Sequence, residues 1–310
     1  MFDTIIIGGG IGGLQAAIQL GRSLHRVMVV DQKSGRSILA KNYRNILGYP
    51  DGVSGEHLRR MGELHAVGLG VQFLTGHAER LTQNQEGLFE VWVRGRTESL
   101  LAKTIVLSTG ITDPLPEIPG LMDCLGESVF ICPDCDGYEV VNRKTAVIGS
   151  GPQAATLAEI LQYFTNRLVV VNHAKTSVDP QTLKKLEAAE IPYYEEEIAS
   201  ILQANGQIQG IMLQNGMLIE CEKGFLSFAG AQTNTDIIKN FPVQFIKNGH
   251  VQVNPRTQET DYPGIWAVGD IVPHAQQVSI AMGDGSKAAI WIHKRLIGIT
   301  KPEKKVLVHN

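Results

Sequence analysis

A glycine-rich turn between a short apolar run and a segment of helical spacing occurs twice in this 310-residue chain. No other feature of the sequence constrains the fold as strongly. The first copy follows Ile5–Ile7 and reads GGGIGG over residues 8–13. Residues 14–22 then have helical spacing, and residues 26–30 form a second apolar run. This order predicts a strand, a tight turn, a helix and a second strand, an arrangement that binds dinucleotides.

The glycines and the acid of this first copy have distinct expected roles. The first glycine makes the tight turn, the second lets the backbone approach a pyrophosphate, and the third lets helix and strand pack closely. The pyrophosphate lies at the helix N-terminus, where free N–H groups favour negative charge. A structural turn with a surface aspartate is the alternative, and the strand–turn–helix context disfavours it. The residues expected to contact the nucleotide are Gly8, Gly10, Gly12, Gly13 and, through its ribose, Asp31.

The second copy lies in the middle of the chain. Residues 145–148 predict a strand, GSGPQA follows at 149–154, and residues 168–171 predict the next strand, which ends at Asn172. The acid typical of NAD sites and the arginine typical of NADP sites are both missing there, so the nucleotide is not identified. His173 and Lys175 are weak phosphate partners or parts of a solvated strand end. The residues expected to line this site are Gly149, Gly151, Pro152, Gln153, Ala154 and Asn172.

Four cysteines are too few for a disulfide scaffold, but two of them are spaced as a redox pair. Two residues separate Cys132 from Cys135, so the sulfurs can meet across a tight turn and cycle between disulfide and dithiol. Asp136 follows directly and can carry the proton of thiol–disulfide exchange. A zinc site and a structural disulfide are the rival interpretations. No second ligand pair exists for zinc, so we expect no metal, and a reducing cytosol disfavours a structural disulfide.

Two further turns fall at the ends of predicted strands. Residues 101–107 predict a strand that leads into Thr109 and Gly110, and residues 265–268 predict one that leads into Gly269 and Asp270. The segment Gly283–Gly285 is predicted to open a final helix. Residues 112–120, with three prolines, and residues 229–235 have the character of crossover linkers.

These elements predict an α/β fold with two Rossmann-like dinucleotide-binding domains, each with three layers around a parallel sheet. The second domain is inserted into the first. Residues 1–113 and 242–310 form the outer domain, and residues 114–241 form the inserted domain with the cysteine pair.

Composition narrows the class of protein. The net charge is −3 and the pI about 6.3, which does not suit a nucleic-acid-binding protein. No apolar stretch approaches the roughly 18 residues of a transmembrane helix, so we expect no membrane insertion. The N-terminus has no charged segment followed by an apolar core and cleavage site, so we expect a cytoplasmic protein.

The order of the motifs resembles that of the low-molecular-weight thioredoxin reductases, a family of flavin disulfide oxidoreductases, over nearly the whole chain. The most specific shared feature is C-x-x-C-D-G just before the second glycine turn. The residues that carry the resemblance are Gly8–Gly13, Ser108–Gly110, Cys132–Gly137, Gly149–Ala154 and Pro263–Asp270.

The resemblance implies that the outer domain binds FAD and that the chain forms a homodimer whose domains rotate. It implies that Cys135 is the sulfur nearest the flavin and that Asp136 is the proton donor. An Arg-Gln pair of the family appears here as Gln276-Gln277. The flavin contacts that the resemblance adds to the first glycine loop are Thr109, Gly110, Gly269, Asp270, Gln277 and Val278.

The sequence departs from the family where NADPH-using members carry arginines. Asn172-His173-Ala174 and Val178 stand at those positions, and Gly48 stands where the family has an asparagine near the flavin. These losses are similar to those of relatives that use no pyridine nucleotide. Some such relatives are reduced by ferredoxin, some hold a second flavin, and others are dithiol oxidases that use O₂.

We therefore predict an FAD-dependent disulfide oxidoreductase that transfers electrons between FAD, Cys132–Cys135 and a thioredoxin-like or small disulfide partner. The electron donor is predicted not to be standard NADPH, and a ferredoxin-type donor is one candidate. The second dinucleotide remains open between NAD(P)H and a second FAD. The alternatives are an ordinary NADPH-dependent thioredoxin reductase, a two-flavin or ferredoxin-linked relative, an O₂-using dithiol oxidase, and a flavin-bearing redox sensor.

Overall fold

The computed structural model describes residues 1–299, and contacts between residues divide the chain into two compact units. Unit 1 consists of Met1–Gly35, Leu58–Ile111 and the described residues from Thr233 onward. Unit 2 consists of Arg36–His57 and Thr112–Gln232, so the chain leaves unit 1 and returns to it. The sequence placed the domain limits at residues 113 and 241, and these limits remain a prediction. Residues 300–310 of the last predicted segment lie outside the described residues.

A seven-stranded sheet forms the centre of unit 1. Strand β1 pairs in parallel with β2 and β6, β3 extends β2, and β17 pairs with the second half of β6. Strands β5 and β4 continue the sheet in antiparallel fashion from the first half of β6. The strands are β1 (Phe2–Ile7), β2 (Val27–Asp31), β3 (Gln72–Thr75), β4 (Ala78–Gln83), β5 (Phe89–Val93), β6 (Leu100–Leu107) and β17 (Ile265–Ala267).

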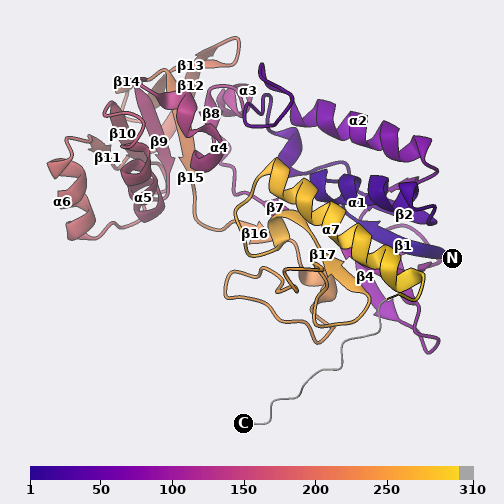
Figure 1. The fold of residues 1–310 in the computed structure, drawn as a ribbon. Helices are drawn as coiled ribbons and strands as arrows, with labels where there is room; N and C mark the ends of the chain where they lie inside the picture. The colour runs from indigo at the N-terminus through magenta and orange to yellow at the C-terminus, as the bar shows by residue number, and fades with distance from the viewer. Residues whose placement is uncertain (300–310) are drawn as a thin grey trace. The chain divides into compact units, whose positions relative to one another are not determined.

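Successive side chains of the central strands point to opposite faces of the sheet. Each face is covered by other parts of unit 1. Ile6 and Val29 pack with α1 and α7 on one face (Figure 1). Ile5 and Val30 pack on the other face with residues of β4, β5 and the segment 237–253. The helices are α1 (Ile11–Arg22), α2 (Gly55–Gly68) and α7 (Val278–Leu296), with the 3₁₀ turns η3 (Asp236–Ile238) and η4 (Gly269–Ile271).

Helix α7 begins at Val278, so the prediction that Gly283–Gly285 open the final helix was wrong. Gly285 lies inside α7, where it faces α1. A Cβ atom on Gly285 would lie 2.3 Å from the carbonyl oxygen of Gly12. The glycine therefore marks a close helix–helix approach rather than a helix start.

Unit 2 is built on a five-stranded parallel sheet in the order β11-β10-β9-β15-β8. One face packs on α5 and α6, and the other on an antiparallel sheet of β12, β13 and β14 together with α3 (Figure 1). The strands are β8 (Val129–Phe130), β9 (Thr145–Gly149), β10 (Leu168–Asn172), β11 (Tyr193–Tyr194), β12 (Ile198–Ala204), β13 (Gln207–Leu213), β14 (Leu218–Glu220) and β15 (Lys223–Ser227). The helices are α3 (Leu121–Cys124), α4 (Pro133–Asp136), α5 (Gly151–Leu161) and α6 (Pro180–Ala188), with η1 (Arg36–Ile38) and η2 (Gly137–Val140).

Two of the four crossings of the chain between the units carry the short strands β7 (Ile111–Thr112) and β16 (Gln232–Thr233), which pair with each other. The predicted α/β class with two Rossmann-like parallel sheets is confirmed, because each unit contains a strand, a glycine turn, a helix and a parallel second strand. No helix within residues 1–299 is both long and apolar enough to cross a membrane.

Candidate functional site

The first glycine loop connects β1 to α1, and three of its glycines are required by close packing. Gly8 has a φ of +102°, and a Cβ atom there would lie 2.2 Å from the carbonyl oxygen of Ser108. A Cβ atom on Gly13 would lie 2.1 Å from the carbonyl oxygen of Gly8, and one on Gly12 would lie 3.2 Å from that of Ala281. These contacts leave no space for side chains, so the loop lies close against β6 and α7.

Gly10 differs from these glycines because the space beside it is open. The nearest atom to a Cβ placed there is the carbonyl oxygen of Ser108, at 3.9 Å. Gly10 is also the N-cap of α1, and no side chain caps the helix or places an acid in its first turn. Backbone N–H groups at such a helix end attract anions. The loop therefore fits the pyrophosphate of a dinucleotide such as FAD.

Asp31 lies at the end of β2, directly beside this loop. One carboxylate oxygen accepts a hydrogen bond from the backbone N–H of Gly9 at 3.0 Å. The other oxygen accepts from Nη2 of Arg59 on α2 at 2.6 Å, and both side chains are almost fully buried. Asp31 thus holds the glycine turn through Gly9, whereas the sequence predicted a contact to the ribose. Arg59 was not predicted, because nothing in its local sequence distinguishes it from a surface arginine.

Thr109, Gly110, Gly269 and Asp270 also lie in unit 1, after β6 and β17. The Thr109 hydroxyl donates to the carbonyl oxygen of Asn234, and the Asn234 amide donates back to that of Thr109 at 3.1 Å. Asn234 N–H also donates to the carbonyl oxygen of Gly110 at 3.0 Å. Gly110 has a φ of +67° with no heavy atom near its missing side chain. The end of β6 is therefore held in place while its outer surface stays open.

Asp284, inside α7, organises the Gly269–Asp270 turn. Its carboxylate accepts the backbone N–H of Gly269 at 3.2 Å, Nε2 of His274 at 2.6 Å and the side-chain amide of Gln258. His274 Nδ1 lies 2.9 Å from the carbonyl oxygen of Ala275. Both ring nitrogens thus face acceptors, and the hydrogen bond to Asp284 raises the pKa of His274. The pair favours the protonated form of the His274 imidazole beside the turn, a feature that the sequence pattern did not reveal.

Gln277 and Val278 lie at the start of α7. Gln277 is the N-cap, without a side-chain hydrogen bond to the helix, and Val278 is its first residue and is buried. The structure therefore places the amino end of α7, together with η4 and the end of β6, in the same unit as the first glycine loop. All predicted FAD contacts belong to unit 1.

The second glycine loop makes a similar close contact at its first glycine, but Gly149 lacks the positive φ of Gly8 and the surroundings of the loop differ. A Cβ atom on Gly149 would lie 1.9 Å from the carbonyl oxygen of Ser227, which matches the relation of Gly8 to Ser108. Beside Gly151, by contrast, a Cβ would lie 2.4 Å from Cγ2 of Val178 and 2.5 Å from the carbonyl oxygen of Thr176. The space that is open at Gly10 is therefore filled at Gly151.

The remaining predicted residues of the second loop lie on α5 and at the end of β10. Pro152 is in the first turn of α5, Gln153 is exposed and Ala154 is buried. Asn172 is fully buried, and its amide nitrogen donates to the carbonyl oxygen of Thr176 and to the hydroxyl of Tyr193, both at 2.8 Å. Its Oδ1 accepts the backbone N–H of Thr176 at 3.2 Å. The side chain of Asn172 therefore points into the interior of unit 2, where its partners lie.

Cys132 and Cys135 form a disulfide, with their Cα atoms 5.3 Å apart. The single turn of α4 brings them together, since the backbone N–H groups of Cys135 and Asp136 both donate to the carbonyl oxygen of Cys132. Both cysteines are partly exposed, so a partner's sulfur can reach them. Among residues 1–299 no cluster of side chains suits a metal ion. The two remaining cysteines, Cys124 and Cys221, are buried.

Asp136 follows Cys135 directly in the chain and is partly buried. Burial, followed by the nearby charge of Glu139, raises the pKa of the Asp136 carboxyl to about 6, and Arg44 opposes the shift. Arg44 and Glu139 form an ion pair at 3.3 Å. Gly137 is required by packing, because a Cβ atom there would lie 2.5 Å from the ring of Phe164. Asp136 therefore exchanges a proton in the pH range where thiols and disulfides react.

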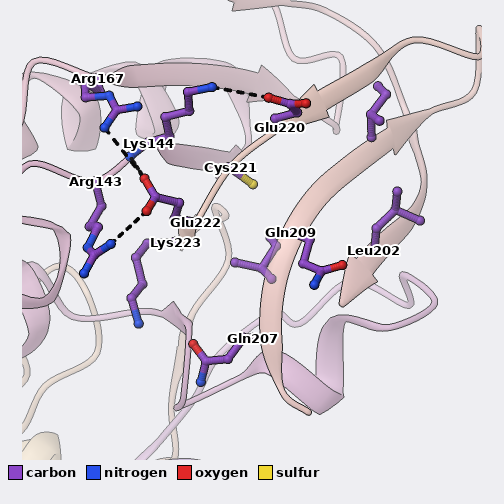
Figure 2. Close-up of a pocket in the computed structure, with 12 residues that line it drawn as sticks. Arg143, Lys144, Arg167, Leu202, Gln207, Gln209, Glu220, Cys221, Glu222 and Lys223 are labelled. Carbon is purple, nitrogen blue, oxygen red and sulfur yellow. Dashed lines mark hydrogen bonds and ion pairs between the residues drawn. The ribbon is translucent and has the colours of Figure 1, made fainter. Parts of the chain in front are cut away.

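A pocket of about 820 Å³ lies elsewhere in unit 2, where β9, β10 and β15 begin (Figure 2). Its charged residues already pair with one another: Glu222 contacts Arg143 at 2.9 Å and Arg167 at 3.8 Å, and Lys144 contacts Glu220 at 3.3 Å. Parallel α/β sheets bind nucleotides at the carboxyl ends of their strands. This pocket lies at the opposite ends and contains none of the predicted site residues.

Comparison with known proteins agrees with this arrangement. The family model described as pyridine nucleotide-disulphide oxidoreductase matches residues 2–285. An alkyl hydroperoxide reductase protein of Xanthomonas campestris pv. phaseoli is 30% identical over 317 residues, which cover 97% of this chain and 58% of that protein. The chain thus spans somewhat more than half the length of that relative.

A thioredoxin reductase from Aquifex aeolicus (strain VF5) is similar over nearly its whole length: it is 26% identical over 313 residues, covering 97% of this chain and 95% of that protein. The crystal structure of thioredoxin reductase from Streptococcus pyogenes MGAS5005 has the same fold. It superposes with a TM-score of 0.84 at 22% identity and covers 96% of this chain and 99% of that one.

Proposed function

This chain belongs to the pyridine nucleotide-disulphide oxidoreductase family, and from that premise we propose that it transfers electrons between FAD in unit 1 and a disulfide partner through Cys132–Cys135. It is a thioredoxin-reductase-like flavin disulfide oxidoreductase, and the family implies FAD and nucleotide binding. The observation that carries the proposal is the partly exposed Cys132–Cys135 disulfide, followed directly in the chain by Asp136, whose carboxyl has a pKa raised to about 6.

Unit 1 provides the FAD site of this proposal. When bound, FAD supplies a carrier that takes up and releases two electrons. The open space at Gly10 and the uncapped start of α1 suit its pyrophosphate, and Asp31 holds the turn of the loop through Gly9. The other residues proposed to hold FAD are Gly8, Gly12, Gly13, Thr109, Gly110, Gly269, Asp270, Gln277 and Val278.

The cysteines carry the exchange with the partner. When the pair is reduced, the Cys132 thiolate attacks one sulfur of the partner's disulfide, and the other sulfur of the partner leaves as a thiolate. Cys135 then attacks the Cys132 sulfur, the second partner sulfur leaves, and the Cys132–Cys135 disulfide forms again. The partner gains two electrons and two protons, and the pair loses them. Asp136 is proposed to supply a proton to a departing or newly formed thiolate, since its pKa of about 6 lets it release one.

The partner is proposed to be a thioredoxin-like protein or a small disulfide. One relative is named as a thioredoxin reductase and another as part of an alkyl hydroperoxide reductase, and both names support a partner of this chemical class. A cytoplasmic location, a homodimer and a ferredoxin-type electron donor are further parts of the proposal.

A half-reaction tests the proposal without knowledge of the natural donor. The FAD-loaded protein is reduced with dithionite under anaerobic conditions and mixed with a small aromatic disulfide, and the released thiolate is measured. We expect rapid release by the wild type. Cys135→Ser is expected to keep its visible flavin spectrum and to release at most one thiolate per chain through Cys132, because no second sulfur can then resolve the mixed disulfide. Cys124→Ala, which lies outside the pair, is the matched control and should retain the rate.

Continued release by Cys135→Ser beyond one thiolate per chain, at the wild-type rate and with flavin bound, would overturn the proposed route through the cysteines. A protein that is colourless as purified and cannot be loaded with FAD would overturn the flavin assignment.

A further inference from the structure

We propose that residues 173–178 of unit 2, here named the strap, occupy the place of the second dinucleotide. Unit 2 then binds neither a nicotinamide nucleotide nor a second flavin, and its only electron-carrying group is the Cys132–Cys135 pair. The inference refines the proposed function and rests on it for the role of the cysteines. The geometry that carries it belongs to unit 2 alone.

The first argument is steric. In a dinucleotide site the second glycine lets the pyrophosphate approach the backbone, so the space beside it belongs to the ligand. Beside Gly151 that space holds Cγ2 of Val178 and the carbonyl oxygen of Thr176, at 2.4 and 2.5 Å from the position of a Cβ atom. The N–H of Ala174 also points to the carbonyl oxygen of Gly149, at 3.4 Å. Gly151 therefore makes room for the strap.

The second argument concerns the polar groups that a nucleotide needs. An asparagine amide nitrogen has two hydrogens to donate. In Asn172 these contact the carbonyl oxygen of Thr176 and the hydroxyl of Tyr193, while Oδ1 accepts the N–H of Thr176. The side chain is fully buried, so a ribose cannot reach it. Pro152 further removes one N–H from the first turn of α5, where a pyrophosphate would bind.

The third argument is electrostatic. Glu195, Glu196 and Glu197 follow β11 and lie beside the strap, where Lys175 contacts Glu196 at 3.0 Å and Glu197 at 3.8 Å. His173 adds no cation, because Nδ1 accepts the N–H of Ile198 at 2.9 Å and burial lowers the pKa of the ring. Three carboxylates thus face one ammonium group. The phosphates of a dinucleotide would meet a surface of like charge.

Titration of the wild-type FAD-loaded protein tests the strap directly. NADPH, NADH and free FAD are each added under anaerobic conditions, and binding is followed by calorimetry while flavin reduction is followed by absorbance. We expect no binding up to about 1 mM, a concentration at which even weak protein ligands bind, and no bleaching of the flavin. Release of one FAD per chain on denaturation is expected as well.

Saturable binding of NADPH or NADH, or the release of two FAD per chain, would overturn the inference. The thiolate-release assay with dithionite-reduced protein separates this failure from a failure of the proposed function. If a nicotinamide nucleotide binds while Cys135→Ser stops after one thiolate per chain, only the strap is wrong. If no nucleotide binds while Cys135→Ser continues to release thiolate like the wild type, only the cysteine route is wrong.

A matched pair of variants gives a second test, with thermal midpoint and FAD affinity measured on the same samples. Gly151→Ala should lower the midpoint by several degrees with FAD affinity unchanged, because the new methyl group displaces the strap. Gly10→Ala should keep the fold and weaken FAD binding by about tenfold or more, because its methyl group enters only the ligand's space. An unchanged midpoint in Gly151→Ala would show that the space is free and would contradict the strap.

Discussion

Asp31 and Asn172 stand at corresponding places in the two units, each at the end of the strand that pairs with the strand before a glycine loop. Asp31 holds the turn of the loop through Gly9 and is neutralised by Arg59, and the space at Gly10 stays open. Asn172 instead binds the backbone of Thr176, and the chain itself fills the space at Gly151. The same glycine motif thus leaves space for a ligand in unit 1 and is filled by the chain itself in unit 2.

The comparison separates what the motif dictates from what it permits. Gly8 against Ser108 and Gly149 against Ser227 make the same contact, so the tight turn next to a third parallel strand needs no ligand. Whether a nucleotide fits depends on the residues after the second strand. In unit 1 these leave the start of α1 open, and in unit 2 they fold back over the start of α5.

The largest effect is expected at the end of β2, with Asp31→Ala. Removing one partner of a buried ion pair leaves the other charge unpaired, which costs about 3–5 kcal/mol. Arg59 and the N–H of Gly9 would both lose their acceptor. Urea unfolding should show this loss of stability, together with loss of bound flavin in the visible spectrum.

Asn172→Ala is the corresponding change in unit 2. It should cost about 1–3 kcal/mol, since neutral buried partners lose their hydrogen bonds, and it should leave flavin content unchanged. If the two variants lost flavin to the same degree, the distinction between the loops would fail.

Asp284→Asn keeps the shape of the side chain but removes its charge, and its expected effect on stability is smaller than that of Asp31→Ala. The hydrogen bonds from His274 and from the backbone N–H of Gly269 to this side chain both become weaker. Hydrogen bonds to charged groups contribute about 1.5–3 kcal/mol to stability. We expect this loss in unfolding experiments and a weaker affinity for FAD. Lys287→Ala is the control, because Lys287 lies 3.8 Å from the same carboxylate but is exposed. Equal effects in both variants would mean that the carboxylate does not organise the turn.

Local pattern predicted most of the framework. The predicted strands at 145–148 and 168–171 correspond to β9 and β10, and the predicted glycine turn at 149–154 leads into α5, which begins at Gly151. Such elements follow from apolar periodicity and glycine turns within a few residues. The confirmed α/β class with two parallel sheets follows from two copies of one local unit.

Long-range partners could not be predicted in the same way. Arg59 lies 28 residues from Asp31, and His274 and Gln258 reach Asp284 from separate loops. Nothing near these residues in sequence encodes the contact, because packing of distant elements brings them together. The strap was equally hidden: Asn172 was predicted to line the second nucleotide site and Val178 was noted only as a missing nucleotide contact. Their use by the chain itself depends on how residues 173–178 fold back.

If the cysteine pair is the redox group of unit 2, the titration of Asp136 should dominate the pH dependence of the stability of unit 2. The folded pKa of about 6 lies above the ordinary value of 3.8, so the unfolded chain loses its proton first as pH rises. The stability that the protonated group contributes is complete below about pH 4 and is lost as pH rises through 6. The slope is at most about 1.4 kcal/mol per pH unit and is reduced by solvent screening. Asp136→Asn should lack this slope when midpoints are compared between pH 4 and 7, and an identical slope would place the titration elsewhere.

The smallest effect is expected from Lys175→Ala in the strap. Lys175 is exposed and pairs with Glu196, and an exposed ion pair contributes little to stability because solvent screens it. If the strap is held by buried contacts of Asn172 and Val178, loss of this cation should leave the thermal midpoint almost unchanged. It should also leave NADPH binding undetectable, because the steric block remains. Were Lys175 instead a phosphate ligand of an open site, the wild type would bind NADPH and the variant would bind it more weakly. Calorimetry on the two proteins therefore distinguishes a strap that replaces the nucleotide from a loop that waits for one.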